Sequence, residues 1–233
     1  RKPISGYAWT GYNRDDLGST FNGFEAGIEA RPSSSVTVRV GPELYLSSDP
    51  QQYVTSDDAP ALDATFGRRY VFGRIDQTTV SLETRVDWTF TSRLSLQVYA
   101  RPFVSRGRYD AFRQMTAPGQ LDFPRFGDDI GSIEEVYAEG ATPGVDAPES
   151  YIVTGPDGGT TEFGNPDFTV RALQGNAVLR WEYRPGSALF LVWQQQRNGF
   201  SSDRGFNLNR QVTDLFRDQS TNVFLLKLSY WLG

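Results

Sequence analysis

Apolar and polar residues alternate with a period of two along residues 80–102. From Val80 to Phe90 the even positions are apolar, apart from Thr84, and the odd positions are polar. Residues 91–93 can form a minimal turn, after which the apolar positions resume at Leu94 and continue to Pro102. Side chains alternate between the two faces of a β-strand. This stretch therefore predicts a long hairpin with one apolar face and one charged face.

The rest of the chain divides into similar segments, eight in all. Short turns at residues 31–35, 91–93 and 184–187 alternate with longer connections at 13–19, 48–67, 108–167 and 200–220. Short turns at one end and long loops at the other are typical of outer-membrane barrels. The predicted strands are residues 3–12, 20–31, 36–47, 68–91, 94–107, 168–184, 188–199 and 221–233.

The predicted strands are long. Strands of soluble proteins usually span about 5–6 residues, whereas several of these reach about 12, which at a tilt near 40° would rise roughly 30 Å. We therefore expect an all-β fold: a single antiparallel up-and-down transmembrane β-barrel of eight strands over residues 1–233. Its turns would be periplasmic and its long loops extracellular.

Aromatic residues gather at the short-turn ends of three predicted strands, as expected for a girdle at a membrane interface. The alternative is that they form the core of a soluble β-sandwich. These residues are Trp88, Phe90, Trp181, Tyr183, Tyr230 and Trp231.

The polar faces of the predicted strands carry equal numbers of acids and bases. Buried charges require partners, so we expect them to pair into a network that fills the lumen of a narrow barrel. Alternatively, they solvate an exposed face. The acids are Glu25, Glu29, Glu43, Glu83, Asp87 and Glu182, and the bases are Arg31, Arg39, Arg85, Arg101, Arg180 and Lys227.

The connection over residues 109–167 is strongly acidic, with twelve carboxylates and two arginines. We expect it to lie outside the membrane, to be dispensable for folding, and to contain a small hairpin around residues 155–159. Three interpretations stay open: a solvated loop, a divalent-cation site and a protein-binding surface. Asp128 and Asp129 offer the oxygen ligands that Ca²⁺ prefers.

Two residue types are missing from the chain, cysteine and histidine. Their absence excludes disulfides, thiolate or histidine metal sites, and catalytic centres that use either residue. The net charge of −5 gives no basis for nucleic-acid binding. We expect neither an enzyme nor a cofactor. Because the chain begins with Arg rather than Met, we expect it to be a mature or trimmed C-terminal piece of a longer protein.

Five stretches of the sequence carry a family resemblance: residues 69–81, 94–103, 165–168, 175–187 and 222–231. They resemble the C-terminal outer-membrane barrel of a bacterial family of unassigned function, whose full-length members carry a family-9-like carbohydrate-binding domain. That domain is missing here, and the chain ends on Leu232 and Gly233 rather than on an aromatic residue. The resemblance implies a barrel larger than eight strands, of which this chain would be a fragment or a reduced form.

Together these features favour a bacterial outer-membrane barrel that acts as a membrane anchor or as a small or plugged channel. Two alternatives are a soluble secreted β-barrel that binds a ligand inside and a surface receptor that acts through its acidic loop. The expected partners are outer-membrane lipid, lipopolysaccharide and a divalent cation at the acidic loop.

Overall fold

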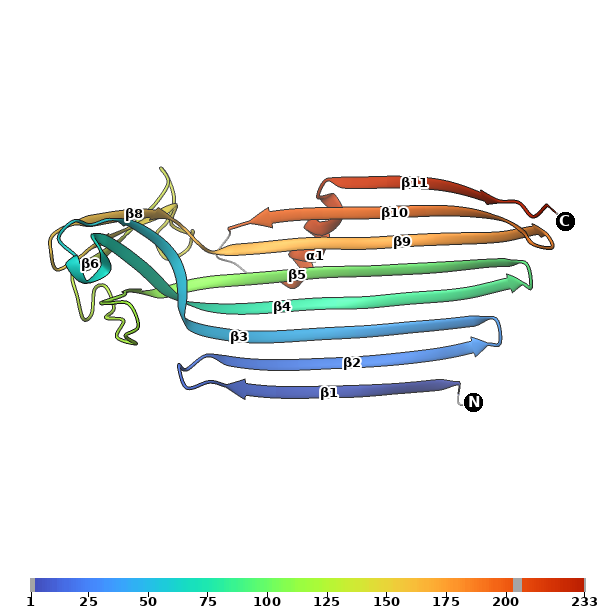
Figure 1. The fold of residues 1–233 in the computed structure, drawn as a ribbon, viewed down its shortest axis with the longest axis horizontal. Helices are drawn as coiled ribbons and strands as arrows, with labels where there is room; N and C mark the ends of the chain where they lie inside the picture. The colour runs from blue at the N-terminus through green and yellow to red at the C-terminus, as the bar shows by residue number, and fades with distance from the viewer. Residues whose placement is uncertain (1–2, 203–206, 233) are drawn as a thin grey trace.

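A computed structural model describes residues 3–202 and 207–232 and shows a large antiparallel sheet with a smaller sheet at one end (Figure 1). The large sheet has eight strands in the order β1-β2-β3-β4-β5-β9-β10-β11. Its strands are β1 Ile4–Arg14, β2 Thr20–Ser33, β3 Val36–Asp58, β4 Arg68–Thr91, β5 Leu94–Gln114, β9 Phe168–Arg184, β10 Ser187–Ser201 and β11 Ser220–Ser229.

The remaining elements belong to the connections. The smaller sheet holds β6 Ser132–Val136, β7 Ser150–Thr154 and β8 Thr160–Gly164 in the order β6-β7-β8. A 3₁₀ helix, Asp63–Thr65, lies between β3 and β4, and the helix α1, Leu208–Arg217, lies between β10 and β11. None of the helices in the described part of the chain is long and apolar enough to cross a membrane.

All eight segments predicted from the sequence are strands of the large sheet. β4 runs through Gly73 without interruption, as predicted. The predicted ends of β3 and β5 are too early, because these strands continue to Asp58 and Gln114. Polar residues replace the apolar pattern there, so alternation alone does not reveal that both strands stay paired with the first part of β4.

The short turns all lie at one end of the large sheet. β1 begins and β11 ends at this same end, on the right of Figure 1, while the long connections and the smaller sheet lie at the other. We call these the turn end and the loop end.

The large sheet is open rather than closed. β1 and β11 form its opposite margins in Figure 1, and each pairs with one neighbour, β2 and β10 respectively. No pairing joins β1 to β11 within the described residues. The closed eight-stranded barrel expected from the sequence is therefore not present here. Counting strands does not determine closure, which requires the two margins to meet and pair.

The acidic segment folds into a compact module against the loop-end extensions of β4 and β5. Its core contains the buried side chains of Val71, Phe112, Tyr151, Val153 and Phe163, together with Phe126. The hairpin predicted around residues 155–159 is present as β7 and β8. The acidic composition indicates solvation, yet the interspersed aromatic residues build the largest buried apolar cluster in the described chain.

One buried arginine ties this module to the large sheet. Arg69 of β4 is 1% exposed, and its guanidinium donates hydrogen bonds to Gln114 Oε1 at 3.1 Å and to the Gly159 carbonyl oxygen at 2.8 Å. It also forms an ion pair with Asp157. A Cβ atom at Gly155 would lie 2.5 Å from Arg69 Nη2, so only glycine leaves room for the guanidinium there.

We predict that Phe112→Ala destabilises the acidic module by about 3–5 kcal/mol, because it removes a buried ring from the centre of the cluster. Limited proteolysis within residues 115–165 should accelerate accordingly. Leu121→Ala is the matched control, since Leu121 is 69% exposed. Equal cleavage rates in the two variants would show that the segment is a loop whose packing does not stabilise it.

Candidate functional site: an apolar band and a charged ladder

The register places apolar residues in a row that crosses all eight strands. This row follows consecutive cross-strand pairs from the first margin of the sheet to the other: Ile4, Ala30, Val38, Val86, Val98, Ala177, Trp193 and Phe224. Such a row requires every pair of strands to keep the same register, because a one-residue slip moves a strand's side chains to the opposite face.

The adjacent row lies on the opposite face and is mostly polar. It contains Ser5, Glu29, Arg39, Arg85, Tyr99, Asn176, Gln194 and Val223. The large sheet therefore has two chemically distinct faces. We call the apolar face in its turn-end part the apolar band, and the residues of the opposite face the charged ladder.

The apolar band has a defined height. In the four central strands it covers residues 36–46, 80–90, 94–104 and 173–183, about 11 residues each, which is the length a tilted strand needs to cross a bilayer. Beyond the band, toward the loop end, the same face becomes polar at Ser48, Thr78, Arg106 and Arg171. Band residues such as Leu191, Leu226 and Leu228 are 45–70% exposed. Most of the band is therefore an uncovered apolar surface, whereas Val104 and Leu173 at its loop-end edge are buried.

The predicted aromatic residues lie at the turn-end border of the apolar band. Trp88 and Phe90 have ring centroids 4.3 Å apart, and Trp181 and Tyr183 have centroids 6.2 Å apart. Near the end of the chain, the guanidinium of Arg184 lies 4.3 Å from the centroid of the Tyr230 ring. The backbone N–H of Trp231 donates to Ser187 Oγ at 2.9 Å.

Five of the predicted charges meet around Arg39 in the charged ladder. Arg39 Nε lies 2.7 Å from Glu29 Oε2, and its Nη1 lies 2.9 Å from Asp87 Oδ2. Arg31 also pairs with Glu29, and Arg85 Nε lies 3.9 Å from Asp87 Oδ1. Arg39 and Arg85 are directly opposite each other in register. Asp87 offsets the repulsion between these two like charges.

A second group of charges centres on Glu43. Arg101 Nη2 lies 2.8 Å from Glu43 Oε2, and Ser81 donates its hydroxyl to the same oxygen. Glu25 is opposite Glu43 in register and accepts the hydroxyl of Tyr45. On β9, Arg180 and Glu182 pair at 3.2 Å.

Three of the predicted charges form no ion pair within the described residues, namely Glu83, Lys227 and Glu25, the last of which contacts only the Tyr45 hydroxyl. Glu83 lies opposite Gly41 in register. Lys227 lies on β11 with its ammonium 5.8 Å from the centroid of the Phe190 ring. The charges are thus brought together on one face, as small clusters separated along the strands rather than as one continuous network.

Aromatic rings occupy part of this face, a feature that the sequence analysis missed. Trp9 and Tyr7 of β1 lie over glycines, because a Cβ atom at Gly23 would be 2.7 Å from the Trp9 ring and one at Gly27 would be 2.3 Å from the Tyr7 ring. The signal was present in the sequence as glycines spaced by four on the predicted polar face.

The acidic module packs on the same face of β4 as the charged ladder. Arg69, Val71, Gly73 and Ile75 are buried, alternate with exposed or half-buried positions, and share the odd-numbered face with Ser81 and Glu83. At the base of the module, the Tyr109 N–H donates to Asp167 Oδ1 at 2.7 Å. Burial, reinforced by the Asp167 carboxylate, raises the pKa of the Tyr109 hydroxyl.

The proposed cation ligands are engaged in local contacts. Asp128 pairs with Arg125 at 2.7 Å, and Asp129 accepts the backbone N–H of Arg125 at 2.9 Å. Within the described ranges, no three carboxylates gather into a metal-binding group.

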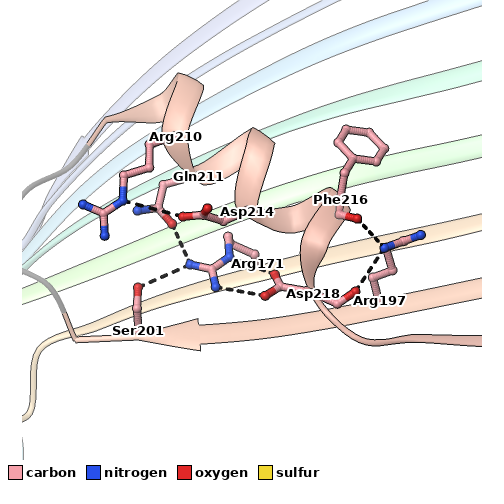
Figure 2. A network of polar contacts seen from close by, with 8 residues as sticks. All are labelled: Arg171, Arg197, Ser201, Arg210, Gln211, Asp214, Phe216 and Asp218. Atoms are coloured by element: carbon pink, nitrogen blue, oxygen red, sulfur yellow. Dashed lines mark hydrogen bonds and ion pairs between the residues drawn. The ribbon is translucent and has the colours of Figure 1, made fainter.

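A second polar cluster holds α1 against the loop end of β9 and β10 (Figure 2). Arg171 forms a bidentate pair with Asp218, at 2.9 and 3.1 Å, and donates to Gln211 Oε1 at 2.8 Å. Arg197 donates to the carbonyl oxygens of Phe216 and Asp218 at 2.7 and 3.0 Å. Gly199 permits this approach, since a Cβ atom there would lie 2.0 Å from Asp218 Oδ2. We call this cluster the α1 clamp.

We predict that Arg39→Ala destabilises the folded sheet more than Arg85→Ala. Arg39 makes two close ion pairs, whereas the one contact of Arg85 with Asp87 is 3.9 Å long. Removing Arg39 also takes from Asp87 its closer cationic partner and leaves Glu29 with Arg31 alone. Urea unfolding in detergent measures the stability of the two variants. If Arg85 were the central charge, Arg85→Ala would be the less stable of the two.

We predict that Arg171→Ala detaches α1 and lowers the stability of its packing by about 3–5 kcal/mol. The reason is that the largely buried carboxylate of Asp218 loses its cationic partner. Chymotrypsin cleavage at Phe216 should rise strongly. Arg210→Ala is the control, since the exposed Arg210–Asp214 pair, at 3.6 Å, should contribute about 0–1 kcal/mol. Unchanged cleavage in Arg171→Ala would show that the clamp does not hold the helix.

Comparison with known proteins gives one match. A family model described as a domain of unknown function (DUF5916) covers residues 5–233. Neither the search of curated proteins nor the search of solved structures returned a match. The family description assigns no activity, membrane barrel or carbohydrate-binding partner. Because the family model covers nearly the whole chain, this chain belongs to the DUF5916 family.

Proposed function

We propose that this chain forms the wall of a bacterial outer-membrane β-barrel and that the barrel anchors the acidic module at the cell surface. The observation that carries the proposal is the apolar band. One of its rows crosses all eight strands, and in the four central strands the band covers about 11 residues, the length of a strand that crosses a bilayer. Strands can span a membrane only as part of a closed barrel, because lipid leaves no partner for an open edge.

The two faces of the sheet suit the inner and outer surfaces of a barrel wall. The apolar band would contact lipid, with the aromatic residues at its turn-end border on the periplasmic side. The charged ladder would face the lumen, where Arg39 and Arg101 already have carboxylate partners. Since charged side chains on a lipid-facing surface are costly, the reverse orientation would place these ion pairs in hydrocarbon.

Closure of the barrel needs partners for β1 and β11. Their free edges in the sheet favour additional strands between them, supplied by another chain segment or by a second copy. A plugged channel needs the narrow, side-chain-filled lumen of an eight-stranded barrel. Such a barrel would form only if β1 paired directly with β11. We therefore place the anchor role ahead of the plugged channel.

The acidic module would then lie over the barrel entrance. It packs against the ladder face of β4 and belongs to the loop end, so in this orientation it leans inward rather than away from the wall. The buried Arg69 contacts fix it there. A rigid, acidic module held at the outer mouth fits a surface role better than a solvated loop does.

We predict that Leu96→Arg impairs insertion into lipid by about 2–4 kcal/mol, because Leu96 lies within the apolar band. Folding into phosphatidylcholine vesicles, read as a heat-modifiable shift on a gel, provides the measurement. Gln97→Arg, one residue along on the ladder face, is the matched control and should insert like the parent chain.

The opposite order, with Gln97→Arg defective and Leu96→Arg normal, would invert the assigned faces. A parent chain that folds in buffer without lipid or detergent would contradict the membrane proposal. That outcome would favour the soluble barrel with a ligand site inside.

A further inference from the structure

The helix α1 lies on the same face of the large sheet as the apolar band, next to the loop-end edge of the band. Arg171, which the helix contacts through Gln211, is the next residue on this face after Leu173, the last band residue of β9. Arg197, which contacts the C-terminal end of α1, lies on the same face four residues after Trp193, toward the loop end. The helix is therefore continuous with the band and not with the charged ladder.

One side of α1 is apolar and uncovered. Leu208, Val212 and Phe216 follow one another at intervals of four, so they share one side of the helix, and they are 38%, 39% and 59% exposed. Leu215, beside them, is fully buried together with Gln211. The apolar stripe formed by Leu208, Val212, Leu215 and Phe216 thus begins where the helix meets the sheet and continues onto the exposed side of the helix.

The helix is fixed in this position rather than loosely attached. The α1 clamp holds its C-terminal end through Arg171 and Arg197, as Figure 2 shows, and Phe216 points away from these arginines. The side chain of Asn207 caps the N-terminus by accepting the N–H of Arg210 at 3.1 Å. A clamp of buried charges that presents three apolar side chains outward indicates a partner for those side chains.

One basic residue lies at the C-terminal end of the helix, and two more lie at the loop-end edge of the band. Arg217 ends α1, and Arg106 and Arg108 follow Val104 on β5 at the level where the band stops. Burial and the neighbouring charge of Arg108 lower the pKa of Arg106. This combination, apolar side chains with cations just above them, matches the boundary between acyl chains and phosphate groups.

We propose that α1 is an interfacial helix that inserts Leu208, Val212 and Phe216 among the acyl chains of the outer leaflet. Arg106, Arg108 and Arg217 would lie at the level of the lipid phosphates. The inference rests on the proposed function, because it takes the apolar band as the lipid-facing surface. Its occupant is membrane lipid rather than a second protein, since the stripe continues a band that spans the whole sheet.

The absence of cysteine from the chain permits a direct test with single-cysteine variants. Val212→Cys, labelled with bimane, should be quenched by phosphatidylethanolamine and phosphatidylglycerol vesicles that carry nitroxide at carbon 5 of the acyl chain. Thr213→Cys is the matched control, because Thr213 is exposed on the polar side of the same turn. We expect quenching at position 212 to exceed that at 213 about twofold or more, as for a helix lying at the acyl boundary.

A third variant separates the failure of this inference from failure of the proposed function. Leu82→Cys reports on the apolar band itself and should be quenched in every folded sample. If position 82 is quenched while 212 and 213 are equally unquenched, α1 does not contact lipid and the inference is wrong. If position 82 is also unquenched in folded protein, the membrane proposal fails with it.

Discussion

An uninterrupted cross-strand register is the constraint on which the rest of this structure depends. Every irregularity in the pairing of the large sheet falls either near a turn, as between Ala30 and Ser33, or in the loop-end extensions, as between Phe72 and Arg74. Between these zones the eight strands keep one register. Because side chains alternate with a period of two, this separates the apolar band from the charged ladder. The separation is clearest in the central strands, since the ladder face of β10 and β11 also carries Phe190, Val192 and Leu225.

The loop end shows what happens where that register is relaxed. Ala111 adopts a left-handed conformation with φ of 50°, and the pairing of β4 with β5 shifts by one residue there. After the shift, the Phe112 ring lies next to Gly73 on the ladder face. The change from charged to apolar side chains on this face provides a base on which the acidic module builds its core. The same strands therefore carry two kinds of structure, a two-faced wall and a packed module.

The fold was largely predictable where the alternation of residue types was strong. Val80, Leu82 and Val86 identified β4 and its apolar face directly, and the equal charges on the opposite face anticipated the contacts of Arg39 and Arg101. Openness of the sheet was not predictable, since the residues of β1 and β11 have the same alternation whether or not the two strands meet. The module was missed because its acidic composition hid the spacing of Tyr151, Val153 and Phe163. The α1 clamp joins residues 40 and 47 positions apart in sequence, which no local pattern reveals.

The most direct test of the central claim is a cysteine scan of residues 80–90 in folded protein reconstituted into lipid vesicles. Accessibility of each labelled position to a nitroxide lipid and to a water-soluble quencher should alternate with a period of two. We expect lipid contact at Val80, Leu82, Val86 and Trp88, and little lipid contact at Ser81, Glu83 and Arg85. Lipid contact at the odd positions, or accessibility without alternation, would contradict it.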